Sequence, residues 1–319
     1  MYEIFADLHV HIGRSESGKP IKITAARTLN FANIAKECES RKGIQVVGII
    51  DCASPYVIED IENFLKNGEA YELKDGGIIY KDKVCILLGS EVETSEKGRN
   101  GKCGSAHNVC FFPYLKDIKG FSEEMSHHIK NITLSTQRSD LSGYELIDIV
   151  EKYNGILIPA HVFTPFKSYY GNCTDRMKDI FKEKYDKIFA IELGLSSDTY
   201  LADMISELEN KTFVTNSDAH SLPKIARKVV ANYGLDPKLG KYHRTHCDNC
   251  EKTIETKEPV EKCPYCGSEK VTFGVFDRIE LIKDKPESTS PQNRPQYIYQ
   301  VPLGFVPGVG GKTIEKLLD

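Results

Sequence analysis

The sequence predicts an α/β fold in which a large domain of alternating strands and helices precedes two small modules. From residue 3 to about 232, short apolar runs alternate with amphipathic segments, a rhythm that favours βα units and a largely parallel sheet or barrel. Four cysteines then gather in two C-x-x-C pairs, and a polar stretch rich in proline and serine follows them. These observations predict three domains, residues 1–235, 243–285 and 286–319.

The elements of the first domain follow from its periodicity. Apolar runs predict strands at Glu3–Leu8, Ile44–Ile50, Val84–Gly89, Asn108–Pro113, Gly155–Pro159, Lys187–Leu193 and Lys211–Thr215. Amphipathic segments predict helices at Thr28–Lys42, Tyr56–Asn67, Ser142–Tyr153, Asp175–Lys184, Ser197–Glu209 and Pro223–Tyr233. Ser142-x-x-Glu145 has the form of a capping box, and Gly43 and Gly155 stand where helices commonly end.

Composition and charge exclude few functions. The 319 residues hold 42 Lys and Arg against 46 Asp and Glu, so the formal charge of −4 gives no reason to expect a polyanion partner. No apolar run approaches the roughly 18 residues of a membrane span, and the N-terminus lacks a signal-peptide core. We therefore expect a cytoplasmic protein that does not enter a membrane, with its scattered cysteines reduced.

Histidines and acids fall at the ends of the predicted strands. They are His9, His11, Asp51, Glu91, His107, His161, Asp218 and His220. In βα architectures the carboxyl ends of the strands converge on one mouth, so these side chains are expected to meet there. The two rings of an H-x-H on a strand point to the same side, because side chains alternate along a strand.

This cluster predicts a metal centre. Five histidines together with these acids are too many for one tetrahedral ion, and they indicate two or more ions that share a bridging carboxylate. A single histidine at a strand end is more often a hydrogen-bonding residue than a ligand, but doublets at successive strand ends are hard to explain by packing. The residues alone therefore predict a multinuclear metal hydrolase.

Four motifs in order resemble those of the polymerase and histidinol phosphatase (PHP) superfamily. They are DLHVH at the N-terminus, Gly89–Glu91, Pro159–His161 in PAH, and Ser217–His220 in SDAH. The resemblance covers residues 1–235 and implies a distorted (β/α)7 barrel with a phosphoesterase centre of two or three divalent ions, Zn, Mn, Mg or Fe. It further implies that His9, His11, Glu91 and Asp218 are catalytic and hold one ion, with Glu91 bridging to a second on His107 and His161.

The third metal position departs from the superfamily pattern. The resemblance assigns His220 to this position. However, Cys52 follows Asp51 where the pattern has a histidine, and Ser17 stands where a later histidine is expected. A thiolate ligand, an absent third ion and an ordinary buried cysteine all remain open at Cys52.

The clustered cysteines predict a structural zinc site. Two C-x-x-C knuckles separated by twelve residues, Cys247 with Cys250 and Cys263 with Cys266, have the spacing of a zinc ribbon. So short a module cannot bury an adequate core, and metal binding would supply its folding free energy. The alternative is a pair of reduced or redox-active dithiols.

The C-terminal segment FVPGVGGKTIEKLLD resembles half of a helix-hairpin-helix. In that motif a glycine-rich turn presents backbone N–H groups to a DNA phosphate, which predicts contacts from Gly308, Gly310, Gly311 and Lys312. The alternative is a turn between two helices of an ordinary bundle. The chain stops inside the second helix of the motif, so a longer relative is expected to continue.

The combination of barrel, cysteine module and hairpin resembles the endonuclease Q family. The resemblance also includes the segments GIIDCASP, HNVCFFP and PAHVFTPFKSYYG. That resemblance implies a repair nuclease that nicks DNA on the 5′ side of deaminated bases (uracil, hypoxanthine, xanthine) and at abasic sites. DNA is therefore the expected partner, and a sliding clamp is a candidate loading partner. Residues beside the metal motifs are expected to line the base pocket, namely Asn216, Ser217, Lys167, Tyr169 and Tyr170. The alternatives are a small-molecule phosphatase of the histidinol-phosphate type and a non-catalytic DNA-binding protein with a relic barrel.

Overall fold

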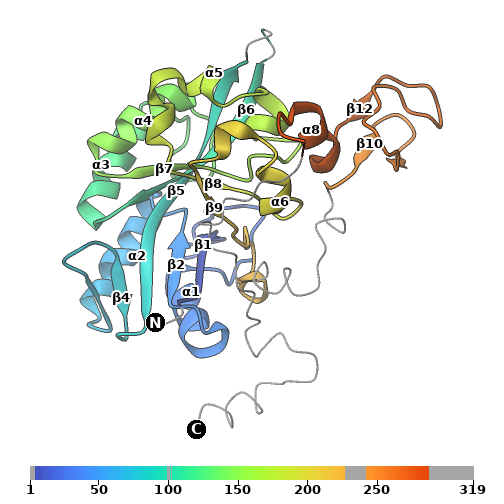
Figure 1. The fold of residues 1–319 in the computed structure, drawn as a ribbon. Coiled ribbons are helices and arrows are strands. Elements are labelled where there is room, and N and C mark those ends of the chain that lie inside the picture. The colour runs from blue at the N-terminus through green and yellow to red at the C-terminus, as the bar shows by residue number, and fades with distance from the viewer. Residues whose placement is uncertain (1–3, 99–100, 102, 227–241, 287–319) are drawn as a thin grey trace.

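The main sheet has seven strands in the order β1-β2-β5-β4-β3, and β6 pairs with β5 and β7 with β6 (Figure 1). The structure is a computed structural model that describes residues 4–98, 101, 103–226 and 242–286. The strands of the main sheet are β1 Ala6–Val10, β2 Val46–Ile49, β3 Ala70–Glu72, β4 Ile78–Tyr80, β5 Val84–Lys97, β6 Cys103–Phe112 and β7 Ile156–Pro159. A separate parallel pair follows, β8 Ala190–Glu192 and β9 Thr212–Val214.

The sheet is mixed, which corrects the expectation of a largely parallel one. β1, β2 and β5 are parallel, but β5 and β6 form a long antiparallel hairpin and β7 runs antiparallel to β6. The sequence predicted only residues 84–89 of β5, because the serines and glutamates that follow resemble a strand end. They lie inside the strand and are mostly buried.

Backbone hydrogen bonds outside the main sheet and the β8–β9 pair connect the last strands of the chain to the first. Ala219, which follows β9, accepts a hydrogen bond from the backbone N–H of His11 and donates one to the carbonyl of His9. Val162, which follows β7, donates to the carbonyl of Glu192 in β8. The strands therefore curve around a shared centre, onto which the ends of β1, β7, β8 and β9 converge.

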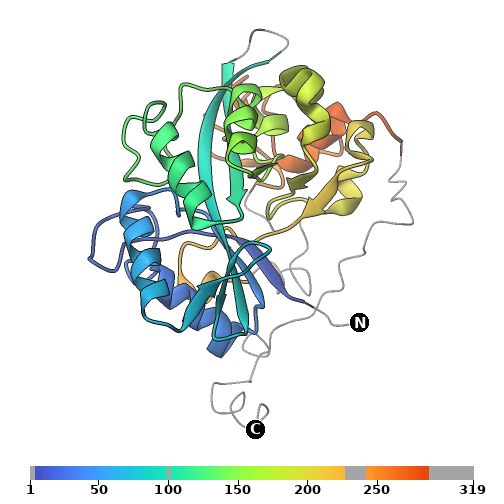
Figure 2. The same ribbon diagram turned by 90° about the vertical axis from the view of Figure 1, so that its left-hand side faces the viewer.

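Helices α2, α3 and α4 cover one side of the main sheet (Figure 2). The helices are α1 Phe31–Glu37, α2 Pro55–Lys66, α3 Leu115–Met125, α4 Gly143–Lys152, α5 Lys178–Phe181, α6 Thr199–Ala202 and α8 Val275–Ile282. Short segments of other helix types are η1 Cys38–Lys42, η2 Tyr169–Cys173, η3 Lys182–Lys187, η4 Ser206–Leu208 and η5 Leu222–Lys224. None of the described helices has the length and apolar character needed to cross a membrane.

Local sequence signals account for several of these boundaries. The capping box at Ser142 and Glu145 is present in full at the start of α4. Gly43 adopts a left-handed conformation (φ 62°) at the end of η1, where a residue without a β-carbon is favoured. Beyond α4 it is Asn154 that adopts the left-handed conformation expected of Gly155. The predicted helix 197–209 is divided into α6 and η4.

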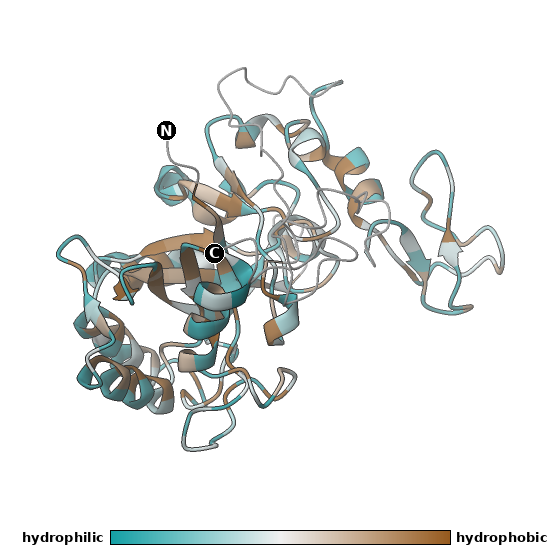
Figure 3. Ribbon diagram, turned by 90° about the horizontal axis from the view of Figure 1, so that it is seen from below, coloured by the Kyte–Doolittle hydropathy of each residue, from teal (hydrophilic) through white to brown (hydrophobic). Residues whose placement is uncertain are grey.

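The cysteine module forms its own small sheet, β11-β10-β12, with strands β10 Thr245–Cys247, β11 Thr253–Ile254 and β12 Val271–Thr272. Its loops are mostly hydrophilic in Figure 3, whereas hydrophobic segments gather in the main sheet. Cys247, Ile254 and Cys263 are the buried members of its core. So small an apolar core agrees with folding that depends on a bound metal.

Candidate metal centre

The first group of candidate metal ligands lies where β1 meets the segment after β9. His9 and His11 are both buried, and their Nε2 atoms lie 3.5 and 3.4 Å from the same Oδ1 atom of Asp218. Val10, between the two histidines, packs in the core, so the alternation of the strand turns both rings toward the centre. The ligand atoms of these three residues lie within 4.8 Å of one another.

The second group comes from the β5–β6 hairpin and the end of β7. Glu91 lies in β5, and its Oε1 atom is 3.0 Å from His107 Nδ1 and 3.7 Å from His161 Nε2. The backbone N–H of Ala160 donates to the carbonyl of His107, which fixes the end of β7 beside β6. These three side chains also offer ligand atoms within 4.8 Å of one another.

Glu91 connects the two groups. Its Oε1 atom lies 3.5 Å from His9 Nε2, and its Oε2 atom lies 3.6 Å from His11 Nε2. One buried carboxylate therefore faces imidazoles from both groups. This is the arrangement in which a single carboxylate can serve two ions. The structure thus brings together the six residues predicted for two metal positions.

Further carboxylates hold the other nitrogens of the first two rings. His9 Nδ1 lies 2.7 Å from Glu192 Oε2, and His11 Nδ1 lies 3.1 Å from Asp51 Oδ2. Asp51 also accepts a hydrogen bond from the backbone N–H of Ile12. Metal-binding histidines usually donate their second N–H to a carboxylate in this way, which sets the tautomer and the direction of the ring.

The donor atoms fit divalent ions. His9 Nε2 and both ring nitrogens of His107 are buried without a hydrogen-bond partner in the described structure, although carboxylate oxygens lie nearby. Buried polar atoms of this kind are costly unless something coordinates them. Imidazole and carboxylate ligands together suit Zn²⁺, Mn²⁺ or Fe²⁺.

The electrostatics of the centre keep its acids ionised. Burial opposes the charge on Glu91, but His107 and Lys22 outweigh it and hold the pKa of this carboxyl well below its usual range. Burial likewise opposes the charge on Asp218, and His11 and His9 lower its pKa strongly. Both groups are therefore available as anionic ligands at neutral pH.

The third metal position is less complete. His220 is partly buried, and its ring lies 4.6 Å from that of His11. Cys52 is fully buried and its Sγ donates to the carbonyl of Ile49, so it behaves as a packed thiol. Ser17 is exposed. Cys52 does not join a described group of candidate ligands.

Two predicted substrate contacts are wrong in this structure. Tyr169 and Tyr170 are fully buried in the core, and their hydroxyls donate to Asn108 and Glu207. The turn η2 directs both rings inward. Adjacency to a metal motif in the sequence therefore did not place these side chains at the site.

Three other predicted substrate residues do lie close to the centre. Asn216 is buried and uses both ends of its amide, accepting from Leu8 N–H and donating to Glu192 Oε2. Ser217 is also buried, and its backbone N–H donates to Asp7. Lys167 is half-exposed and lies 2.6 Å from Glu93 Oε2. Only the lysine of these three therefore presents a substantial part of its side chain to solvent.

A cavity of about 190 Å³ opens beside the second group. Its lining includes His107, His161, Lys167, Asn216, Asp218 and Tyr242. Tyr242 directly precedes the cysteine module and makes an edge-to-face contact with Phe166, which is 53% exposed. The cavity therefore lies between the metal centre and the cysteine module.

Sequence reasoning missed several residues of the site. They are Glu192, Glu93, Lys22 and Arg138. Glu93 carried a signal, since it follows Glu91 by two residues and so shares its face of the strand. Glu192, at the end of a three-residue strand, had no neighbouring motif to mark it.

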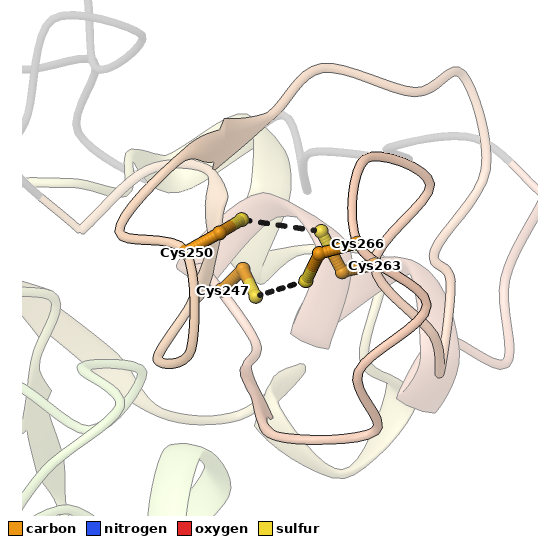
Figure 4. A group of neighbouring side chains, drawn as sticks. All are labelled: Cys247, Cys250, Cys263 and Cys266. Atoms are coloured by element: carbon orange, nitrogen blue, oxygen red, sulfur yellow. Dashed lines mark hydrogen bonds between the residues drawn. The ribbon is translucent and has the colours of Figure 1, made fainter.

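The four cysteines of the module converge on one point (Figure 4). Sγ of Cys247 lies 3.6 Å from that of Cys266, and Sγ of Cys250 lies 3.6 Å from that of Cys263. A tetrahedral ion with Zn–S bonds of about 2.3 Å places its sulfurs about 3.8 Å apart. The geometry supports a zinc ribbon.

The predicted helix-hairpin-helix lies outside the described residues. Gly308, Gly310, Gly311 and Lys312 all fall in 287–319, so their DNA contacts stay a prediction.

The chain has a relative along nearly its whole length, although no protein-family model matches it. It is 43% identical over 344 residues to the uncharacterized protein YqxK of Bacillus subtilis (strain 168), covering 99% of this chain and 86% of that protein. It is also 38% identical over 173 residues to the uncharacterized protein MJ0043 of Methanocaldococcus jannaschii, covering 44% of this chain and 21% of that protein.

Two solved structures of endonuclease Q share its fold. The lesion-specific endonuclease PfuEndoQ of Pyrococcus furiosus matches with a TM-score of 0.73 and 28% identity, over 99% of this chain and 81% of that one. Endonuclease Q in complex with a 27-mer duplex that carries an abasic lesion at the active site matches with a TM-score of 0.72 and 28% identity, over 98% and 81%. The chain therefore belongs to one family with YqxK and is endonuclease Q-like in its fold, with two groups of candidate metal ligands and a four-cysteine module.

Proposed function

We propose that this metal-dependent nuclease nicks DNA on the 5′ side of deaminated bases, or at abasic sites, in DNA repair. The observation that carries the proposal is the pair of ligand groups joined by Glu91, in a chain that aligns along 98% of its length with endonuclease Q bound to lesion DNA. We further propose that its ring of strands corresponds to a distorted (β/α)7 barrel over residues 1–235, followed by a zinc module over 243–285 and a partial helix-hairpin-helix over 286–319.

The proposed metal ligands divide between two positions. His9, His11 and Asp218 would hold one ion and His107 with His161 the other, with Glu91 shared between them. Bound divalent ions would supply Lewis-acid stabilisation of the phosphate charge and lower the pKa of a water molecule. We favour two ions over three, because Cys52 and Ser17 leave His220 with little support for a third position.

The protein's own contribution is to hold this centre rigid. Glu192 and Asp51 set the directions of His9 and His11 through their Nδ1 atoms. Non-glycine residues with positive φ stand at the site, namely His161 (32°) and Asp218 (46°). Such conformations cost free energy and persist where the surrounding structure imposes them, which agrees with a preorganised site.

The cavity beside His107 and His161 is the proposed base pocket. Lys167 lies at its edge, and Phe166 with Tyr242 provides an aromatic wall. Taking a base out of a duplex costs a few kcal/mol, and less when the base is mismatched or absent. Stacking on an exposed aromatic ring would offset part of that cost.

Three further expectations belong to this proposal. DNA contacts from the turn at Gly308, Gly310 and Lys312 would extend the binding surface. A sliding clamp stays the predicted loading partner, and the cytoplasm the predicted compartment.

The deciding experiment incubates the full chain and Mn²⁺ or Mg²⁺ with end-labelled duplexes that carry uracil, inosine, an abasic site or only normal bases. A small phosphomonoester is assayed in parallel. We expect nicking only at the lesions, on their 5′ side. Equal cutting of the undamaged duplex would refute lesion specificity, and turnover of the monoester alone would favour the small-molecule phosphatase.

A further inference from the structure

Two cations beside the metal centre are tethered to a single buried carboxylate, Glu93. Its Oε1 atom accepts hydrogen bonds from Nε and Nη2 of Arg138 at 3.0 and 2.8 Å, and its Oε2 atom accepts one from Nζ of Lys167 at 2.6 Å. Glu93 is 5% exposed at its side chain, whereas Arg138 is 63% and Lys167 49% exposed. The carboxylate is thus buried while both cationic groups reach solvent.

The backbone places the two cations on either side of the β5–β6 pair. Glu93 and His107 are cross-strand partners in this pair. The backbone of Glu93 accepts from Ser139 N–H and donates to Gln137, which fixes Arg138 on the free edge of β5. The N–H of His107 donates to the carbonyl of Lys167, which fixes the lysine beside β6.

Lys167 is also held in a demanding backbone conformation. Its φ of 53° lies in the left-handed region, which a lysine seldom adopts. The hydrogen bond from His107 and the contact with Glu93 hold it there. An ordinary surface lysine would need no such support, so the structure gives up some stability to direct this side chain.

The tethered pair is close to the reacting centre. Glu93 follows Glu91 by two residues on the same face of β5, a step of about 7 Å along a strand. Lys167 lines the 190 Å³ cavity, and Arg138 lines a separate cleft of about 840 Å³. Each cation therefore borders a hollow of the surface.

We propose that Arg138 and Lys167 form a phosphate-binding clamp, oriented by Glu93, for a DNA backbone phosphate next to the one that is cleaved. This inference rests on the proposed function, because it takes DNA as the ligand. Glu93 uses two of the five guanidinium N–H donors and one of the three ammonium donors, so donors are left for a phosphate. The clamp carries one net positive charge, since two cations share one carboxylate.

The test measures the salt dependence of DNA binding. The Kd for a fluorescent undamaged duplex is measured in salt from about 50 to 200 mM. The proteins compared are the parent full-length protein, Arg138→Gln and Lys167→Gln. Phosphate contacts carry no sequence information, so a lesion is not needed. Each substitution is expected to reduce the slope of log Kd against log salt by about 0.9, the double variant by about twice that, and Lys167→Arg to retain the parental slope.

Matched controls are available on the outer helices. Lys119 is 47% exposed and paired with Glu62, and Arg41 is 75% exposed and paired with Glu37. Lys119→Gln and Arg41→Gln should leave the slope unchanged. Parental slopes in both Arg138→Gln and Lys167→Gln would overturn the clamp, as would an equal loss in the controls.

The same preparations separate the clamp from the proposed function. If the parent binds the duplex but does not nick lesion DNA, the repair assignment fails. The slopes of log Kd against log salt then still show whether Arg138 and Lys167 bind a phosphate. If the parent nicks lesions while the variants keep the parental slope, the clamp alone fails. Absence of DNA binding by the parent would overturn both.

Discussion

Glu192→Gln is the most direct test of how the metal centre is held. Glu192 is 1% exposed, and one of its oxygens serves both His9 Nδ1 at 2.7 Å and Asn216 Nδ2 at 3.0 Å. Burial opposes protonation of His9, but the Glu192 charge outweighs it and raises the pKa of His9 well above its usual value. Glutamine keeps the shape and an acceptor oxygen but removes that charge.

The expected loss follows from the strength of the hydrogen bond. A bond to a charged group contributes about 1.5–3 kcal/mol and a neutral one about 1 kcal/mol, so the substitution costs roughly 0.5–2 kcal/mol at His9. Since about 1.4 kcal/mol corresponds to a factor of ten, metal affinity should fall about two- to thirtyfold. Outer carboxylates of metal-bound histidines typically show effects of roughly this size.

The assay is a calorimetric titration of the metal-depleted full chain with Mn²⁺, followed by nicking of lesion DNA at saturating Mn²⁺. Glu207→Gln is the matched control, because Glu207 is also buried and accepts from Tyr170 and from Met177 N–H, away from the ligand groups. Unchanged Mn²⁺ affinity in Glu192→Gln would refute the positioning role. An equal loss in Glu207→Gln would show that the effect is general destabilisation.

The remaining predictions concern three separate parts of the molecule. Asp218→Asn should abolish nicking while DNA binding stays measurable by anisotropy, and cutting at the parental rate would contradict its assignment as a ligand. Cys263→Ser should lose about one zinc per chain by elemental analysis and weaken DNA binding, with the main sheet and its helices still folded. Burial raises the pKa of Asp60 to about 6, above its ordinary 3.8, so folding favours its protonated form and stability falls as the pH rises from the ordinary value through 6. In denaturant titrations, Asp60→Asn should therefore stabilise the protein by about 1–2 kcal/mol near pH 7.5, after allowance for solvent screening. Near pH 4 it should stabilise the protein by almost nothing. An equal gain at both pH values would contradict this account.

The candidate ligands that stand in compact motifs could be predicted from the sequence. His9 with His11, and Asp218 with His220, are doublets whose spacing matches the period of a strand or a tight turn. Their chemistry is local, because two neighbouring imidazoles on one face already define most of a metal position. The cysteine knuckles are local in the same sense, and the structure brings their four sulfurs together.

Other parts of the site depend on contacts between distant segments. Glu192 reaches His9 across 183 positions of the chain, and Arg138 reaches Glu93 across 45. Neither residue lies in a motif, so no periodicity could have paired them. The β5–β6 hairpin was also missed in part, because buried glutamates and serines interrupt its apolar pattern. Among those polar residues, Glu91 and Glu93 face the candidate metal centre.

By itself the sequence determined the α/β class and the two kinds of metal-binding motif, because these depend on residue type and short spacing. It also marked the six central candidate ligands, because they are polar residues at the ends of predicted strands. Tertiary structure decided that Glu91 lies between both ligand groups and that Glu93 tethers two cations. It also decided that Tyr169 and Tyr170 belong to the core. The physical reason is that orientation and burial are set by how strands pair and turns rotate, and these depend on the whole chain at once.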